Sequence, residues 1–120
     1  MPMTFYDCSG KPVAYTEDDV HIFLYSGIPV GYLYNSSVYA YTGRHLGTLR
    51  SGWIRDQAGH GVLFTDEAAS GVSPLPPKLV KPRKLLKKPK PPKGSREAPP
   101  PRAEDVEEWS QQAGEGFFGS

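Results

Sequence analysis

Four glycines recur at nearly constant spacing in the first half of the chain and limit what it can fold into. Intervals of 17, 16 and 16 residues separate Gly10, Gly27, Gly43 and Gly59. Five positions before each glycine lies an apolar residue, namely Phe5, Ile22, Val38 or Ile54. Three positions after each lies another, namely Val13, Val30, Leu46 or Val62. A fixed period of this kind indicates four copies of one supersecondary unit.

Each copy has the pattern of a β-hairpin. Short runs of Val, Ile, Tyr and Phe flank the glycine, and such runs favour strands. The glycine supplies the left-handed backbone of a tight or bulged turn. Further turn signals between the copies occur at Asp18-Asp19, Ser36-Ser37 and Ser51-Gly52. Residues 2–67 are therefore predicted to form an all-β domain of eight antiparallel strands in four hairpins.

Closing the four hairpins on one another removes exposed strand edges, so the pattern predicts a pseudo-four-fold barrel or flower. Strict alternation places the residues four before and four after each glycine on the outer face. The first set is Tyr6, Phe23, Tyr39 and Arg55, and the second is Ala14, Gly31, Gly47 and Leu63. In three copies an aromatic ring is expected to lie over the small residue of a neighbouring strand. This second apolar face requires a cover, either the tail of the same chain or another subunit.

Several motifs carry a resemblance to a known family. The repeats "GKPVAY" and "GIPVGY", followed by "YTGRHLG" and "GWIRD", resemble the four-fold beta-flower domain of small uncharacterised bacterial proteins. Members also carry a Lys/Pro-rich tail and an aromatic C-terminal motif similar to Gly114-Glu115-Gly116-Phe117-Phe118. Thr42 stands where the family usually has Asn, and Ala113 where it usually has Ser. The resemblance implies the four-hairpin fold and no established activity.

The rest of the chain has a different composition. Ten of the 13 prolines follow residue 71. Residues 78–102 carry ten basic side chains and one acidic one, whereas residues 103–120 carry five acidic side chains and no basic one. A segment rich in Pro and Lys buries too little apolar surface to offset its ordering entropy. Residues 68–103 are therefore predicted to be an extended, polyproline-like linker, and residues 104–120 an acidic and aromatic docking segment.

Two binding functions follow from the tail, and the sequence leaves both open. In the first, Trp109, Phe117 and Phe118 dock on a partner protein or on a neighbouring copy, and the β-domain self-associates. In the second, basic side chains bind nucleic acid or another anionic surface. The candidates for this second site are Lys81, Arg83, Lys84, Lys87, Lys88, Lys90, Lys93 and, in the β-domain, Arg44. The first function, a non-enzymatic interaction or assembly module, is the leading hypothesis.

Catalytic and metal chemistry is not indicated. The histidines, His21, His45 and His60, occupy three different offsets within the repeats and lack metal-ligand spacing. The single cysteine, Cys8, excludes an internal disulfide, and the neighbouring Asp7 disfavours the thiolate. A small hydrolase using His45 or Cys8 is the weakest of the hypotheses, and no cofactor or metal is expected. Without a membrane-length apolar run or a signal-peptide pattern, a cytoplasmic location is expected.

Overall fold

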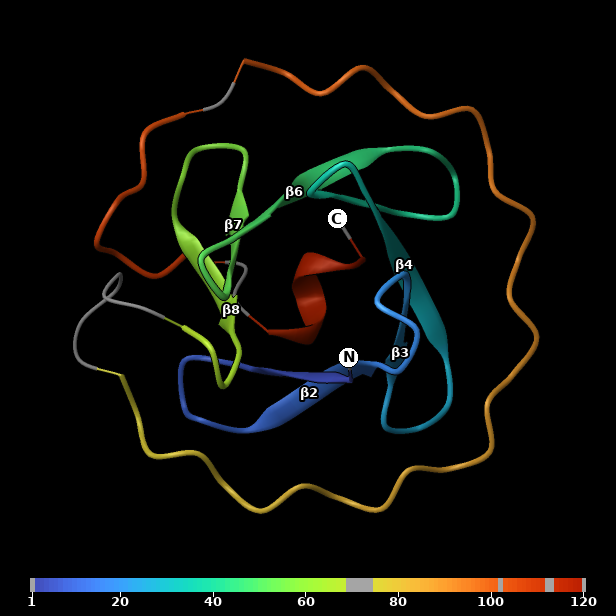
Figure 1. The fold of residues 1–120 in the computed structure, drawn as a ribbon, viewed down its shortest axis with the longest axis vertical. Coiled ribbons are helices and arrows are strands. Elements are labelled where there is room, and N and C mark those ends of the chain that lie inside the picture. Colours follow the sequence, from blue (N-terminus) through green and yellow to red (C-terminus); the bar gives the residue numbers. More distant parts are fainter. Residues whose placement is uncertain (1, 69–74, 102, 112–113, 120) are drawn as a thin grey trace.

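A computed structural model describes residues 2–68, 75–101, 103–111 and 114–119. Eight strands form one closed antiparallel barrel in which each strand pairs with the next (Figure 1). The strands are β1 (Met3–Tyr6), β2 (Pro12–Thr16), β3 (His21–Leu24), β4 (Pro29–Tyr34), β5 (Ser37–Tyr39), β6 (His45–Arg50), β7 (Trp53–Asp56) and β8 (Gly61–Phe64). Pairing of Tyr6 with Phe64 closes the barrel between β1 and β8. The prediction of an all-β flower is thus confirmed.

The four repeats coincide with the hairpins β1–β2, β3–β4, β5–β6 and β7–β8. Gly10, Gly27, Gly43 and Gly59 all have positive φ, between 82° and 96°, as the turn assignment required. The connections between repeats use other turns. Asn35 and Ser36 both adopt positive φ, and so do Ser51 and Gly52, which is the backbone of a two-residue type I′ hairpin turn.

Every repeat contains a register shift at the same position, and this corrects the predicted faces. In the first repeat the partner of Phe5 is Ala14, whereas the partner of Tyr6 is Pro12, so Val13 is left as the bulged residue. The same shift recurs at Ile22/Phe23, Val38/Tyr39 and Ile54/Arg55. Val13 and Ala14 both enter the main core, as do Val62 and Leu63. The outward assignment of the fourth residue after the glycine was wrong, because a bulge breaks strand alternation.

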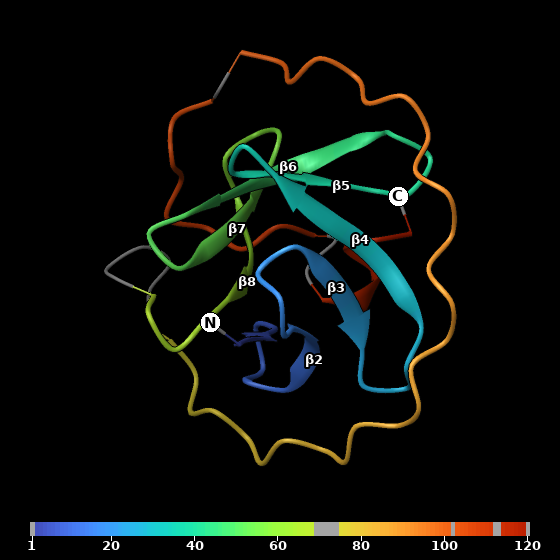
Figure 2. The same ribbon diagram turned by 45° about the vertical axis from the view of Figure 1, so that its right-hand side comes forward.

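The tail winds around the outside of the barrel rather than away from it (Figures 1 and 2). We call residues 75–101 together with 103–110 the belt. Backbone hydrogen bonds of 2.8–3.0 Å tie it to the turn glycine of each repeat. They run from the amides of Leu79, Lys88, Glu97 and Val106 to the carbonyls of Gly10, Gly27, Gly43 and Gly59, respectively. The segment predicted to be an extended linker thus lies over the second apolar face, as in the alternative in which the tail of the same chain covers it.

The belt contacts lie nine residues apart, whereas the barrel glycines lie 16 or 17 apart. Its length fits the perimeter of the molecule, whose principal extents are 36 × 36 × 25 Å. At ~3.1 Å per residue, the 27 steps from Leu79 to Val106 span roughly 84 Å, about three quarters of the circumference of a disc 36 Å across. One extended stretch of nine residues thus serves each quarter of the barrel.

The C-terminus returns to the centre of the barrel. A short 3-10 helix, η1 (Glu115–Phe117), lies there in Figure 1. Phe117 and Phe118 are 2% and 7% exposed and belong to the main core. The rings lie beside Gly31 and Gly47, where a Cβ atom would lie 3.7 Å from the Phe118 ring and 3.1 Å from the Phe117 ring. The same Cβ atoms would lie closer still to the neighbouring strand, 2.7 Å from the Tyr39 carbonyl and 2.1 Å from the Arg55 carbonyl. We call residues 114–119 the plug.

Candidate binding surface on the belt

Cationic side chains of the belt pack on aromatic rings of the barrel at nine-residue intervals. Lys78 lies over the Tyr6 ring and Lys87 over the Phe23 ring, at 5.8 and 5.5 Å from the ring centroids. Nine residues further along, the Arg96 guanidinium lies 3.7 Å from the Tyr34 centroid. Contacts of this kind attract a cation to the negative face of the ring. Tyr34 lies at the end of β4, and the third-repeat equivalent of Tyr6 and Phe23 is Tyr39, whose hydroxyl donates to the Glu97 carbonyl at 3.0 Å.

The fourth repeat reverses the chemistry. Arg55 occupies the position that Tyr6 and Phe23 hold in the first two repeats, and the corresponding belt residue is Asp105. The Asp105 carboxylate lies 3.4 Å from Nε of Arg55 and 3.4 Å from a guanidinium nitrogen of Arg50. Arg55 also donates to the carbonyls of Gly59 and Val106. The one repeat without an aromatic residue at this position therefore receives an anion instead of a cation.

A second set of lysines holds the belt midway between the glycine contacts. Lys84 lies 4.4 Å from the Tyr15 centroid and Lys93 lies 4.7 Å from the Tyr32 centroid. The carboxylate of Glu17 accepts hydrogen bonds from both Lys84 and Lys87. The hydrogen bond to Glu17 raises the pKa of the Lys87 ammonium, and the same lysines lower the pKa of Glu17. Of the predicted anion-binding residues, Lys84, Lys87 and Lys93 thus also serve to hold the belt.

The outer side of the belt carries both positive charge and apolar surface. We call residues 75–93 the basic stretch, because they hold eight Lys or Arg side chains and no Asp or Glu. Lys81, Arg83, Lys88 and Lys90 are exposed there. Val80 is 93% exposed and Leu86 is 91% exposed, while Leu79 and Leu85 are about half exposed. The structure thus collects seven of the eight predicted anion-binding residues in one arc, with Arg44 lying elsewhere on the barrel.

The predicted docking aromatics lie against their own barrel. Trp109 packs on Trp53 and Phe64, with centroids 5.3 and 6.1 Å apart, and its neighbour Ser110 donates to the Gly61 carbonyl. Phe117 and Phe118, in the plug, pack in the main core of the barrel. Sequence reasoning placed all three on a neighbouring domain or a partner, whereas in this chain Phe117 and Phe118 are buried in their own barrel and Trp109 is partly buried against it. The reason is the path of the belt, which brings the C-terminus back to the barrel after one circuit.

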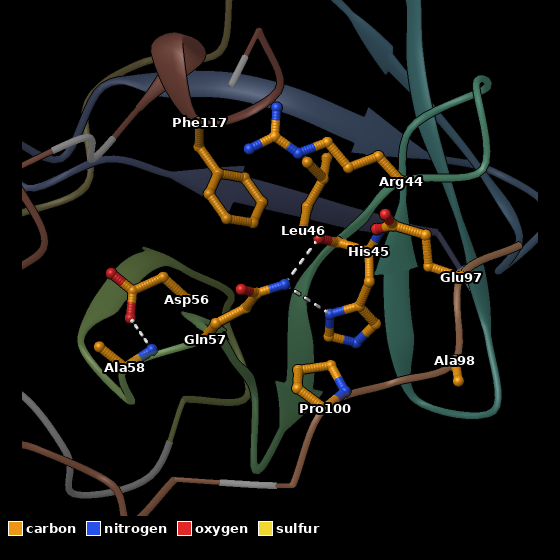
Figure 3. Close-up of a pocket in the computed structure, with 10 residues that line it drawn as sticks. All are labelled: Arg44, His45, Leu46, Asp56, Gln57, Ala58, Glu97, Ala98, Pro100 and Phe117. Carbon is orange, nitrogen blue, oxygen red and sulfur yellow. Dashed lines mark hydrogen bonds between the residues drawn. The ribbon is translucent and has the colours of Figure 1, made fainter.

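Arg44 and His45 line a pocket of about 600 Å³ beside the plug (Figure 3). The buried His45 ring contacts Ser37 Oγ at 3.1 Å through Nε2 and Gln57 at 3.3 Å through Nδ1. Burial lowers the pKa of His45, and the nearby Glu97 carboxylate opposes this effect. Glu97 Oε1 also accepts the His45 backbone amide at 2.8 Å. These bonds give His45 a structural role in joining two strands and the belt.

The remaining candidates take part in turns. The Asp7 carboxylate accepts the amides of Ser9 and Lys11 beside the exposed Cys8. His21 Nδ1 lies 2.7 Å from Asp18, and His60 lies 3.6 Å from Asp56. Within the described residues, no three His, Cys, Asp or Glu side chains gather in a way that would hold a metal ion. Nor does that part of the chain contain a helix long and apolar enough to cross a membrane.

Sequence reasoning offered the tail as one of two possible covers but did not use a periodic signal in the tail itself. Pro82, Pro91 and Pro100 are nine residues apart. Lys78, Lys87 and Arg96 follow the same period. A nine-residue repeat in a proline-rich tail has no meaning by itself. It becomes informative only when compared with the four repeats of the barrel.

The sequence profile described as "4-fold beta flower protein" matches residues 3–118. The chain belongs to this family. The match extends well beyond β8, so the beta-flower unit includes the belt and the plug as well as the barrel. The beta-flower family is not a known enzyme family. No curated protein and no solved structure matches the chain.

Proposed function

We propose that this beta-flower protein is a non-enzymatic module that binds an anionic surface through the basic stretch of its belt. One observation carries the proposal: eight cationic side chains and no acidic one lie in a continuous arc that is fixed to a rigid barrel. Such an arc attracts polyanions from about a Debye length away. Its binding releases counterions that had condensed on the polyanion. It needs no catalytic group.

The attachment of the belt supports the proposal. A flexible basic tail loses conformational entropy when it binds, whereas this one is already ordered by backbone bonds at Leu79, Leu85 and Lys88. Among the lysines that contact aromatic faces, Lys78 pairs with Asp66, and barrel Glu17 pairs with both Lys84 and Lys87, so barrel carboxylates offset part of their charge. A ring face does not neutralise a cation, so Lys93, over the Tyr32 ring, contributes its charge to the arc. Lys81, Arg83, Lys88 and Lys90 are exposed for contact with the partner. The arc is therefore preorganised.

Salt-dependent binding to heparin tests the proposal. We expect the full chain to bind fluorescein-labelled heparin with an affinity that falls steeply as salt rises. The double variant Lys81→Ala/Lys88→Ala should bind several-fold more weakly. The matched control, Lys11→Ala/Arg44→Ala, removes two charges from barrel turns and should bind like the parent chain. Equal losses in the two variants, or no binding by the parent chain, would overturn the proposal.

Self-association is a second candidate function, and the charge asymmetry of the belt favours it. The basic stretch lies on one side of the disc, whereas the exposed Glu104, Glu107 and Glu108 lie further along the belt. Opposite charges on two arcs favour head-to-tail contact between copies. Sedimentation at low and high salt tests this. A mass that stays monomeric at low salt excludes it.

Docking of the terminal aromatics on a partner remains a further prediction. It requires Trp109, Phe117 and Phe118 to leave the contacts described above. A pull-down that depends on Trp109 in a chain whose barrel stays folded would support it.

A further inference from the structure

We infer that the anionic surface is the headgroup region of a lipid membrane, into which Val80 and Leu86 insert. This inference rests on the proposed function and specifies its partner. The motivating observation is that the most exposed large apolar side chains of the described residues lie within the basic stretch.

The apolar residues form two pairs. Leu79-Val80 and Leu85-Leu86 are separated by four residues, of which three are Lys or Arg. A phosphate-binding strand gains nothing from exposed Val and Leu, whereas burying them in acyl chains removes their apolar surface from water. Cations that neighbour apolar side chains are typical of segments that bind anionic membrane interfaces. The two pairs therefore add a contribution that charge alone does not provide.

The backbone holds both pairs in place before any membrane is met. The amide of Leu79 donates to Gly10 at 2.9 Å, and the amide of Leu85 donates to Tyr25 at 2.9 Å. Each bond anchors the first residue of a pair, and the second residue points into solvent with more than 90% of its surface exposed. Insertion would consequently require no ordering of this arc.

The position of the arc permits contact with a flat surface. It runs along the rim of the disc, over the lower edge of Figure 1 and on up its right-hand side, so part of it can face a flat surface. The acidic part of the belt, with Glu104, Glu107 and Glu108, follows on a later part of the same rim. An anionic bilayer attracts the first arc and repels the second, so the molecule would be oriented with the basic stretch towards the membrane.

Nucleic acid fits this arc less well. Residues 75–93 contain no Phe, Tyr or Trp, so the stretch has no side chain on which bases stack. The barrel aromatics nearest to it, Tyr15 and Tyr32, are buried under Lys84 and Lys93. Backbone phosphates alone would remain as the ligand, and they leave Val80 and Leu86 without a role.

Co-sedimentation of the full chain with vesicles tests the inference. We expect binding to vesicles of phosphatidylcholine with phosphatidylserine, and little binding to phosphatidylcholine alone. Val80→Ser/Leu86→Ser should lower the partition coefficient by ~5-fold or more, because the buried apolar groups are lost. The control Ile28→Ser removes an exposed apolar side chain of a barrel turn, outside the stretch, and should change the partition coefficient little. Circular dichroism should show that each variant is folded.

Heparin binding distinguishes a failure of the lipid inference from a failure of the proposed function. The serine variant keeps every charge, so its heparin affinity should equal that of the parent chain. Unchanged heparin binding together with unchanged vesicle binding in Val80→Ser/Leu86→Ser overturns the lipid inference and leaves the proposed function standing. Loss of both ligands in the parent chain overturns both. Tight binding to an oligonucleotide with no vesicle binding assigns the arc to nucleic acid.

A fluorescent label gives an independent readout. In Cys8→Ser/Val80→Cys, an environment-sensitive dye at position 80 should shift to the blue when phosphatidylserine vesicles are added. The same label at position 11 in Cys8→Ser/Lys11→Cys should not shift. Identical spectra at position 80 with and without vesicles would contradict insertion.

Discussion

At the scale of single residues, the four turn glycines meet two demands at once. Their positive φ suits a residue without a side chain. In addition, a Cβ atom at each would lie 1.9–2.0 Å from a belt carbonyl, that of Pro77, Leu86, Ser95 or Glu104. The glycine that forms each hairpin turn is therefore also the position at which the belt crosses the barrel. The period seen in the sequence marks both features.

Gly27→Ala should destabilise the protein for this double reason. The new methyl group would meet the Leu86 carbonyl, and the backbone would be strained at φ 92°. We expect a loss of about 1–3 kcal/mol in the free energy of unfolding, measured by urea denaturation. Gly116→Ala is the control, since its added Cβ has no atom within 4 Å. Equal free energies of unfolding for Gly27→Ala and Gly116→Ala would show that the belt does not approach this turn closely.

His45 should make stability depend on pH. Burial lowers its pKa in the folded chain, so the unfolded chain binds the proton more readily. The contribution of neutral His45 to the free energy of unfolding is fully present above the pKa of the unfolded chain, ~6.5. It is lost as the pH falls from there through the lower pKa of the folded chain. His45→Asn should flatten the dependence of the unfolding midpoint on pH in that window. A parent midpoint that stays constant below neutral pH would contradict the assignment.

At the scale of elements, bulge and plug are connected. The repeated bulge turns two consecutive residues of β2, β4, β6 and β8 towards the interior. Where the second of these is Gly31 or Gly47, Phe118 or Phe117 of the plug lies beside it. Where it is Ala14 or Leu63, the side chain itself helps to fill the core. The barrel interior therefore departs from four-fold symmetry at this position, where two repeats have glycine beside the plug and two have a side chain.

Phe117→Ala tests whether the plug is part of the core. We expect a loss of about 3–5 kcal/mol in the free energy of unfolding, because the ring is 2% exposed and its removal leaves a cavity. Leu86→Ala removes an apolar side chain that is 91% exposed and serves as the control. Similar unfolding midpoints for the two variants would show that η1 does not occupy the barrel centre.

At the scale of the whole molecule, the belt turns a small barrel into a larger cooperative unit. A barrel of about 66 residues alone offers a marginal core. The belt adds backbone bonds to all four turns, and it covers aromatic rings that the barrel otherwise exposes. One segment therefore both stabilises the fold and presents the charged arc. The side of the belt that faces the barrel stabilises the fold, and its outer side carries the exposed charges.

Removing residues 104–120 should consequently destabilise the barrel. The truncation deletes the Val106 bond to Gly59, the Asp105 pairs with Arg50 and Arg55, the Trp109 contact and the plug. The loss of these contacts predicts a lower melting temperature and a weaker near-ultraviolet circular dichroism signal. Removing Met1 and Pro2 is the control. A truncated chain that melts like the parent chain would show that the contacts contribute nothing to stability.

The sequence by itself determined the barrel, because its signals are local. A glycine turn and flanking apolar residues specify a hairpin within 16 residues, and four copies specify closure. Only the tertiary structure decided the bulges, the belt and the plug. The alternation expected along a strand does not show where a bulge interrupts it. An extended proline-rich chain makes no local hydrogen bonds that would reveal its path. The nine-residue period matches one quarter of the barrel's perimeter, a distance that exists only once the barrel has closed. For the same reason, the sequence alone suggested that Trp109, Phe117 and Phe118 bind another protein, whereas the path of the belt places them against their own barrel.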